Sequence, residues 1–270
     1  EHPQAAEQLL AALQDPLPDQ PELLTAMAAF ALEKGQQTRA GELALLALEK
    51  TPRTAPPPRA ISPLLLELGM NEECLQASQQ LLEKAPNHGP TVAVYAEALC
   101  RSGDPLAAAR QIEVAALMKP DRLDLQRKLA GYLEEAEDYQ EAIAVRSRIL
   151  SKLQKTSQAK SSSEPFLPAD DLQAFARCAY AGGQYQRAAA ATRQNLHSQP
   201  DHGPAHITLG KSLLKLNQEE EAYQHLEKAV VAAPEREETW IALADALFSS
   251  GDPQKAVKTL QLGINAANSS

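Results

Sequence analysis

The sequence predicts an all-α chain built from repeated helix pairs, and three observations support this fold class. A proline recurs every 34 residues, at Pro18, Pro52, Pro86 and Pro120 and again at Pro200 and Pro234. A period of 34 residues is typical of stacked helix–turn–helix units. Small side chains recur in the same frame. The composition also fits, because alanine and leucine are abundant, aromatic residues make up only 4% of the chain, and strand-forming runs are missing.

The proline frame can be tested at positions that the prolines do not define. With the proline at position 32, seven repeats span 21–54, 55–88, 89–122, 123–156, 169–202, 203–236 and 237–270. Position 8 then carries Ala28, Ser62, Ala96, Ala130, Ala176, Gly210 and Ala244, and position 20 carries Ala40, Cys74, Ala108, Ala142, Ala188, Ala222 and Ala256. Antiparallel helices that cross closely need small residues where they touch. We therefore expect these residues at the helix crossing within each repeat.

Four segments follow from this frame. Residues 1–20 are expected to form a partial repeat with an N-terminal helix, and residues 21–156 form repeats one to four. The interval from Pro120 to Pro200 exceeds two periods by 12 residues, which places a Ser- and Pro-containing insert at 157–168. Such a segment is predicted to be flexible. A plain solvated loop is the simplest interpretation, and a hinge or a phosphorylation segment are alternatives. Residues 169–270 form repeats five to seven.

Polar residues before the second helices predict how these helices begin. Asp104 and Asp252 each precede a proline and are expected to cap the helices that follow. Asp138 and Asn217 are each followed three residues later by a glutamate, which predicts capping boxes.

Repeat two departs from the pattern because prolines occupy the start of its first helix. Pro56, Pro57 and Pro58 precede Pro63, and a proline inside a helix removes a hydrogen bond and clashes with the preceding turn. We therefore expect this helix to begin late, near Ser62, after an extended segment.

The pattern resembles that of the tetratricopeptide repeat family over about the whole chain. The matching residues are Leu209, Gly210, Ala222, Leu226, Ala229 and Pro234 in repeat six, and Trp240, Leu243, Ala256 and Leu260 in repeat seven. The resemblance implies a right-handed α-α superhelix of about seven helix pairs plus an N-terminal partial repeat. It also implies a concave groove, lined by the first helix of each repeat, that usually holds a peptide.

Charge and cysteine content narrow the function classes. The formal net charge of −9 argues against binding to nucleic acid, which needs a basic surface. Apolar runs fall short of the roughly 18 residues of a membrane span, so no membrane insertion is expected. The three cysteines form no CxxC pair, which favours a reducing compartment over a disulfide framework. We therefore expect a cytoplasmic location.

Catalytic motifs such as a Gly-rich phosphate loop or His-Glu-x-x-His are missing from the sequence. We therefore expect no enzyme activity, no catalytic residue, no cofactor and no metal site. His202 and His206 have a spacing that can chelate a metal, with His197 nearby, but His202 falls in a turn, so surface histidines are the expected outcome.

The cysteines are expected to be packing residues. Cys74 occupies the small position 20, and Cys100 and Cys178 lie next to core positions of their helices. Reactive thiols occur in electropositive, partly exposed environments, so none of the three is assigned a reactive role.

The groove implied by the family is the predicted binding surface. In repeats five to seven, apolar residues at positions 5 and 12 alternate with cations at positions 9 and 13, and a cation of repeat four extends the line. The predicted peptide-binding residues are Arg127, Arg177, Tyr180, Ile207, Lys211, Leu214, Lys215, Ile241 and Phe248. An apolar stripe flanked by cations suits an acidic-hydrophobic peptide. Alternatively, the apolar side chains tuck under the neighbouring repeat and the cations pair with Glu134, Glu135 and Asp170.

The sequence therefore predicts a non-enzymatic scaffold or adaptor that binds a peptide segment of a protein partner. The two-carboxylate clamp of some family members requires asparagine on the first helices. No asparagine occupies position 9 in this chain, so recognition of chaperone C-termini is not expected. One alternative is an assembly or regulatory domain of a larger multidomain protein. Another is self-association through the last helix, 253–267, which carries Val257, Leu260, Leu262 and Ile264.

Overall fold

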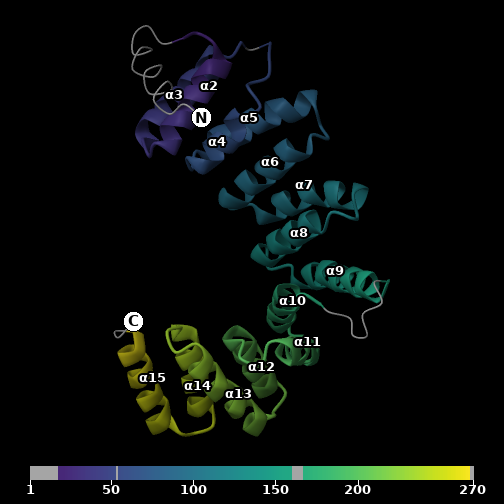
Figure 1. The fold of residues 1–270 in the computed structure, drawn as a ribbon, viewed down its shortest axis with the longest axis vertical. Helices are drawn as coiled ribbons and strands as arrows, with labels where there is room; N and C mark the ends of the chain where they lie inside the picture. Colours follow the sequence, from purple (N-terminus) through teal and green to yellow (C-terminus); the bar gives the residue numbers. More distant parts are fainter. Residues whose placement is uncertain (1–17, 53, 160–166, 268–270) are drawn as a thin grey trace. The chain divides into compact units, whose positions relative to one another are not determined.

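The computed structural model describes residues 18–52, 54–159 and 167–267. Within these ranges the chain forms fourteen α-helices and no strand, which confirms the all-α helical-repeat fold (Figure 1). The predicted helix within 1–20 lies almost entirely outside the described residues, and so do residues 160–166 of the predicted insert. The chain divides into two compact units, Glu1–Ala136 and Glu137–Ser270, so the insert falls within the second unit.

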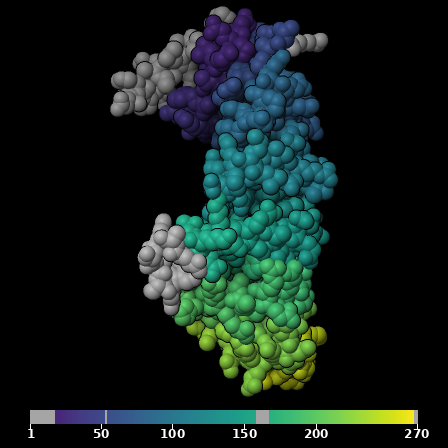
Figure 2. All heavy atoms as spheres, turned by 90° about the vertical axis from the view of Figure 1, so that its right-hand side faces the viewer, coloured from purple at the N-terminus to yellow at the C-terminus, as the bar shows by residue number. Residues whose placement is uncertain are grey.

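The helices alternate as first and second members of the repeats. The first unit contains α2 (Pro21–Glu33), α3 (Gln37–Lys50), α4 (Ile61–Glu67), α5 (Asn71–Lys84), α6 (Gly89–Arg101), α7 (Pro105–Met118) and α8 (Leu123–Glu135). The second unit contains α9 (Tyr139–Ala159), α10 (Ala169–Ala181), α11 (Tyr185–Ser198), α12 (Gly203–Lys215), α13 (Glu219–Ala232), α14 (Glu237–Ser249) and α15 (Pro253–Ala267). In the space-filling view the second unit, teal to yellow, forms one continuous body of atoms (Figure 2).

The predicted helix crossings form the core. All fourteen small residues at positions 8 and 20 are buried. Gly210 shows why size matters there, because a Cβ atom added to it would lie 2.6 Å from Cγ of Leu226 on the partner helix. Close packing of this kind leaves no room for even one methyl group at that position.

The turn within each repeat depends on one left-handed residue at position 15. Seven residues with positive φ occupy this position: Gly35, Gly69, Gly103, Gly183 and Gly251, together with Glu137 (φ 58°) and Asn217 (φ 59°). The predicted capping box at Asn217 is therefore wrong. Asn217 forms the turn itself, and Gln218 precedes α13 without a side-chain cap. The caps at Asp104 and Asp252 are confirmed, since each carboxylate accepts a hydrogen bond from a backbone N–H three residues on.

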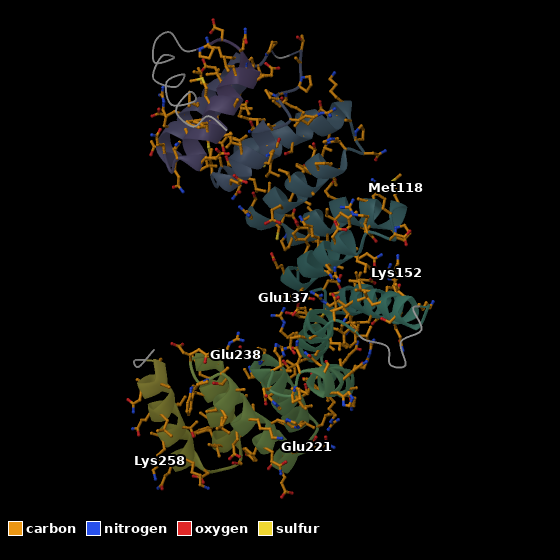
Figure 3. The ribbon with its side chains drawn as sticks, in the orientation of Figure 1. Met118, Glu137, Lys152, Glu221, Glu238 and Lys258 are labelled. Carbon is orange, nitrogen blue, oxygen red and sulfur yellow. The ribbon has the colours of Figure 1, made fainter. Side chains whose placement is uncertain are left out.

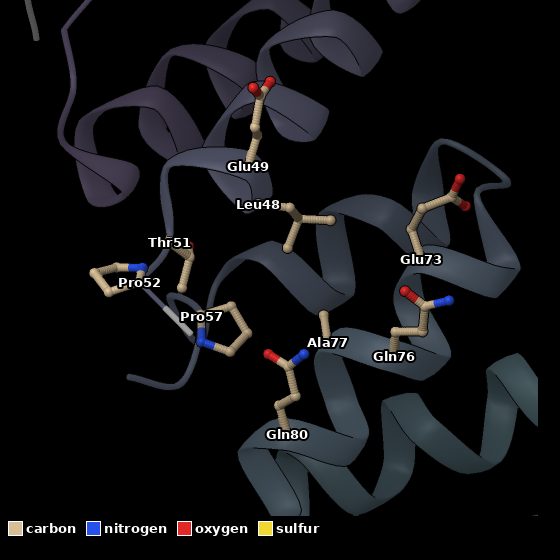
Figure 4. A pocket seen from close by; sticks show the side chains of 9 residues that line it. All are labelled: Leu48, Glu49, Thr51, Pro52, Pro57, Glu73, Gln76, Ala77 and Gln80. Atoms are coloured by element: carbon tan, nitrogen blue, oxygen red, sulfur yellow. The ribbon is translucent and has the colours of Figure 1, made fainter. Parts of the chain in front are cut away.

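Repeat two is irregular as its prolines predicted. Its first helix, α4, begins only at Ile61 and has seven residues, with Pro63 tolerated in the first turn. The displaced segment leaves a cavity of about 340 Å³ between the end of α3, the proline segment and α5. Leu48, Pro57 and Ala77 supply its apolar surface, and Glu49 and Glu73 lie among the lining residues (Figure 4).

Candidate functional site

The candidate site is a pocket of about 470 Å³ on the first helices of the second unit, named here the groove pocket. It is lined by Asp170, Gln173, Ala174, Arg177, Tyr180, His202, Pro204, Ile207, Thr208, Lys211, Arg236 and Glu238. Ten of these residues come from α10, α12 and the start of α14, where Figure 3 labels Glu238, and the other two directly precede α12 and α14. The volume falls within the usual range of ligand pockets.

Four of the nine predicted binding residues meet in the groove pocket. Arg177 is exposed, Tyr180 and Lys211 are half-buried, and Ile207 is only 2% exposed because α14 packs over it. The other five lie outside the pocket lining: Leu214, Lys215, Ile241 and Phe248 elsewhere in the second unit, and Arg127 on α8 of the first.

The cations of the groove pocket differ in their pairing. Lys211 Nζ lies 3.3 Å from Oε1 of Glu238, an ion pair that the sequence did not predict. Arg177 has no ion-pair partner among the described residues, and the same is true of Arg236. Three cationic side chains thus face two acidic ones, Asp170 and Glu238, in a chain of net charge −9. The pocket is locally basic and keeps two guanidinium groups open to a ligand.

Eight of the twelve lining residues were not among the predicted binding residues, and two of these eight, His202 and Arg236, lie just outside the helices. Both occupy position 34, directly before the first helix of the next repeat, where they are the N-cap residues of α12 and α14. The predicted binding positions all lie inside the helices, although the repeat frame also brings each N-cap residue to the edge of the groove. A frame that includes position 34 predicts both residues.

His202 presents an unsatisfied polar atom in the groove pocket. Its Nδ1 is buried without a hydrogen-bond partner among the described residues. Burial lowers the pKa of this imidazole below its ordinary value, and Arg236 lowers it further, while Asp170 opposes the shift. The neutral ring can accept or donate a hydrogen bond to a ligand in the pocket.

A hydrogen-bond network fixes one wall of the groove pocket. Gln173 Nε2 donates to Pro204 O at 3.1 Å and to Thr208 Oγ1 at 3.0 Å, which joins α10 to α12. Asn195 Nδ2 on α11 donates to Ala169 O at 3.3 Å. These bonds fix the positions of α11 and α12 relative to α10, which carries Arg177.

The expectation of surface histidines is wrong for His206, which is only 4% exposed. Its Nδ1 lies 2.9 Å from Nδ1 of His225 on α13, and its Nε2 lies 2.8 Å from Pro200 O. A carbonyl only accepts, so His206 Nε2 is protonated and the proton between the two rings belongs to His225. The rings stack with centroids 5.1 Å apart. Sequence reasoning missed this pair because its members lie on different helices.

The equivalent groove face of the first unit is closed by its own contacts. Tyr132 Oη donates to Glu97 Oε2 at 2.9 Å, and Arg101 Nε pairs with the other oxygen of Glu97 at 3.1 Å. Cys100 Sγ donates to Glu135 Oε2 at 2.6 Å. Burial and the Glu135 carboxylate raise the pKa of Cys100 to about 12, so this thiol is protonated at neutral pH.

The other two cysteines are packing residues, as predicted. Cys74 is fully buried, and its thiol donates to Ser62 O at 3.2 Å. Cys178 is 2% exposed, which is more buried than the sequence suggested. Groups of three or more histidine, cysteine or acidic residues that could hold a metal ion are not found in the part of the chain that the structure describes.

Three family profiles match parts of the sequence. Two of them are described as tetratricopeptide repeat and match residues 96–158 and 219–270. The third, described as anaphase-promoting complex, cyclosome, subunit 3, matches residues 136–229. No curated protein matches the sequence.

Solved structures with the same fold are numerous. A tetratricopeptide repeat protein from Parabacteroides merdae is 17% identical, with a TM-score of 0.54, and the match covers 96% of this chain and 91% of that one. A putative kinesin light chain with nearly identical TPR-like repeats, from Podosopora anserina, is 20% identical, with a TM-score of 0.53 and coverage of 67% and 95%. At these identities the likeness shows the fold alone. No helix in the described ranges has the length and hydropathy of a membrane span.

Proposed function

We propose that this chain, two segments of which match tetratricopeptide repeat profiles, is a non-enzymatic scaffold or adaptor that binds a peptide segment of a protein partner in the groove pocket. The observation that carries the proposal is the exposed guanidinium of Arg177. It has no acidic partner among the described residues, and it lines the same pocket as the Tyr180 ring.

The lining of the groove pocket favours a peptide that combines an acidic and an apolar side chain. A carboxylate of the peptide would form charge-assisted hydrogen bonds with Arg177, which are roughly twice as strong as neutral ones. An apolar side chain beside it would pack on the half-buried Tyr180 ring. Lys211 adds a second cation once the peptide competes with Glu238, whose side chain is 56% exposed.

A peptide-display selection against the whole chain tests this proposal. Enriched peptides are expected to carry Asp or Glu within a few residues of Leu, Ile or Phe. Synthetic versions should then bind in fluorescence anisotropy, and the double variant Arg177→Glu/Lys211→Glu should weaken them at least about tenfold, because two favourable charge contacts become repulsive.

The matched control is Lys255→Glu/Lys258→Glu, which makes the same charge change on α15, outside the pocket lining. It should leave peptide affinity unchanged apart from a small long-range effect that added salt removes. The proposal fails if both double variants weaken binding equally, or if the enriched peptides show no preference for acidic residues.

A further inference from the structure

A second surface of the second unit is apolar and exposed. It is named here the C-terminal face and consists of Ile241 and Phe248 on α14 with Val257 and Leu260 on α15. Their exposed fractions are 48%, 68%, 54% and 40%. In Figure 1, α15 lies beside α14, and no other described helix of the second unit covers its other side. This face is separate from the groove pocket, whose lining contains none of the four residues.

The repeat frame gives each of these residues an equivalent 34 positions earlier, in repeat six. Ile207 corresponds to Ile241 and is 2% exposed, and Leu226 corresponds to Leu260 and is fully buried. Leu214 and Tyr223 correspond to Phe248 and Val257, and both are partly buried. The same surface is thus covered in repeat six and uncovered in repeat seven.

The helix that covers repeat six is α14, and it does so with small residues. Ala242 and Ala246 pack against Ile207, Leu226 and Ala229 in one buried cluster. The two alanines are 2% and 1% exposed, so larger side chains have no space there. Tyr223 Oη also donates to Ala246 O at 2.9 Å, which fixes the register of α14.

The first helices of the second unit share this feature. The positions of Ala242 and Ala246 are 6 and 10 of the repeat, and small residues also fill them in α10 and α12. These are Ala174 with Cys178 and Thr208 with Ser212. Each of these helices can therefore approach the preceding helices closely.

We propose that the C-terminal face binds one amphipathic helix of a partner protein, and that this helix carries two small residues four positions apart. The helix lies on α14 and α15 as α14 lies on α12 and α13, with its small residues against Ile241 and Leu260. The proposed interface repeats the one that α14 makes with α12 and α13, because large apolar residues occupy the same repeat positions on the surface that receives the helix.

A partner helix fits this face better than a second copy of the chain. In α14 the small pair, Ala242 and Ala246, is already buried within the second unit, so α14 of a second copy cannot supply it. The first described helix, α2, carries Ala26 and Phe30 at positions 6 and 10, and the phenylalanine ring replaces the second small residue. Head-to-tail stacking through α2 therefore places a large side chain at the closest point of contact.

A labelled peptide with the sequence of residues 236–250 is the probe, because it carries the small pair in a helix known to fit this kind of face. Its anisotropy should rise saturably with added protein. The protein variant Ile241→Ser/Leu260→Ser should weaken binding at least about tenfold, since two apolar contacts are lost. Phe248→Ser, at a 68% exposed site, gives a second variant with little effect on folding.

Two matched controls make the result specific. Val231→Ser removes another apolar side chain of the same unit, 81% exposed, and should not change binding. A peptide with Ala242→Leu and Ala246→Leu should bind at least about tenfold more weakly, because overpacking prevents close approach. Displacement of the chain's own α14 by the peptide would carry Phe248 away with that helix, so a loss of binding with Phe248→Ser identifies the face.

Three outcomes overturn the proposal. One is the absence of saturable binding. Another is equal binding of the leucine-substituted peptide. The last is a concentration-dependent doubling of mass in light scattering that Ile241→Ser/Leu260→Ser abolishes, which would show that a second copy covers the face.

Discussion

The groove faces of the two units use the same repeat positions for opposite chemistry. At position 9 the first unit has Glu97, whereas repeats five and six of the second unit have Arg177 and Lys211. Glu97 is held by Tyr132 and Arg101, while Arg177 has no ion-pair partner in the described ranges. If the proposed function holds, we expect the pairing of the groove side chains, rather than the repeat backbone, to decide where a ligand binds, because a paired group must give up its partner before it can contact a ligand.

The largest expected effect concerns the close helix crossing on which the second unit depends. Gly210→Val should destabilise the chain by about 3 kcal/mol, because the added atoms would overlap sterically with the side chain of Leu226. Ala96→Gly, at position 8 of the first unit, should cost only about 1 kcal/mol through helix propensity. Urea unfolding followed by circular dichroism measures both. Equal losses would contradict the steric clash assigned to Gly210.

Acid sensitivity should come from the second unit. Burial lowers the pKa of both His206 and His225 below 6.5. The unfolded chain therefore binds more protons than the folded one between the folded pKa values and 6.5. The stabilisation from the neutral pair is complete above pH 6.5 and is lost as the pH falls below it.

The charged neighbours of the histidine pair do not change this direction. They are Lys228, Asp201, His202, Glu221 and Arg193. The variant His206→Phe/His225→Phe should show a flatter dependence of melting temperature on pH between 7 and 5 than the wild type. The single variant His225→Phe should cost about 1–3 kcal/mol at pH 7, because it leaves Nδ1 of His206 without its donor. An unchanged pH profile in the double variant would contradict this assignment.

The closed groove of the first unit should suppress thiol chemistry. With a pKa of about 12, Cys100 is almost entirely protonated at pH 8 although it is partly exposed. Glu135→Gln removes one of the charges that raise this pKa and should speed alkylation by iodoacetamide roughly tenfold, as expected for a shift of about one unit. Peptide mass spectrometry reads out each cysteine separately, and buried Cys74 serves as the internal control. The alkylation rate of Cys100 should be higher in the Glu135→Gln variant than in the wild type, and equal rates would refute the role of Glu135.

The smallest effect is expected at the turns that lack glycine. Asn217→Gly in the second unit should stabilise the chain by about 0.5 kcal/mol, because glycine adopts positive φ without steric strain. Gly103→Asn, the reverse change in the first unit, should destabilise it by a similar amount. Thermal unfolding of both variants checks the pair. Effects of the same sign would show that position 15 does not control the turn.

Repeating features of the structure were predictable from the sequence, and single contacts were not. The proline period and the small residues at positions 8 and 20 predict the helix pairs, because every repeat must satisfy the same close crossing. Pro63 predicts the late start of α4 for a steric reason that acts within one turn of helix. Each of these signals is either local or present in most of the repeats.

The groove contacts depend on pairs that occur only once. Lys211 pairs with Glu238, and His206 pairs with His225, across different helices and with spacings that no repeat position predicts. The neighbours of Asn217 fit a capping pattern, and this local pattern led to the wrong prediction of a cap. The glycines at the same position in five other repeats, taken together, predict a left-handed turn residue instead.

The short helix of repeat two also determines how the array opens. In a stack where each repeat contacts only its neighbours, the free energy of local opening depends on the contacts made by the repeat that opens. With seven residues, α4 offers its neighbours about half the length of α2 or α6, which have thirteen each. We therefore expect thermal opening of the first unit to start at α4, whose amide protons should exchange with solvent before those of the helix pairs on either side.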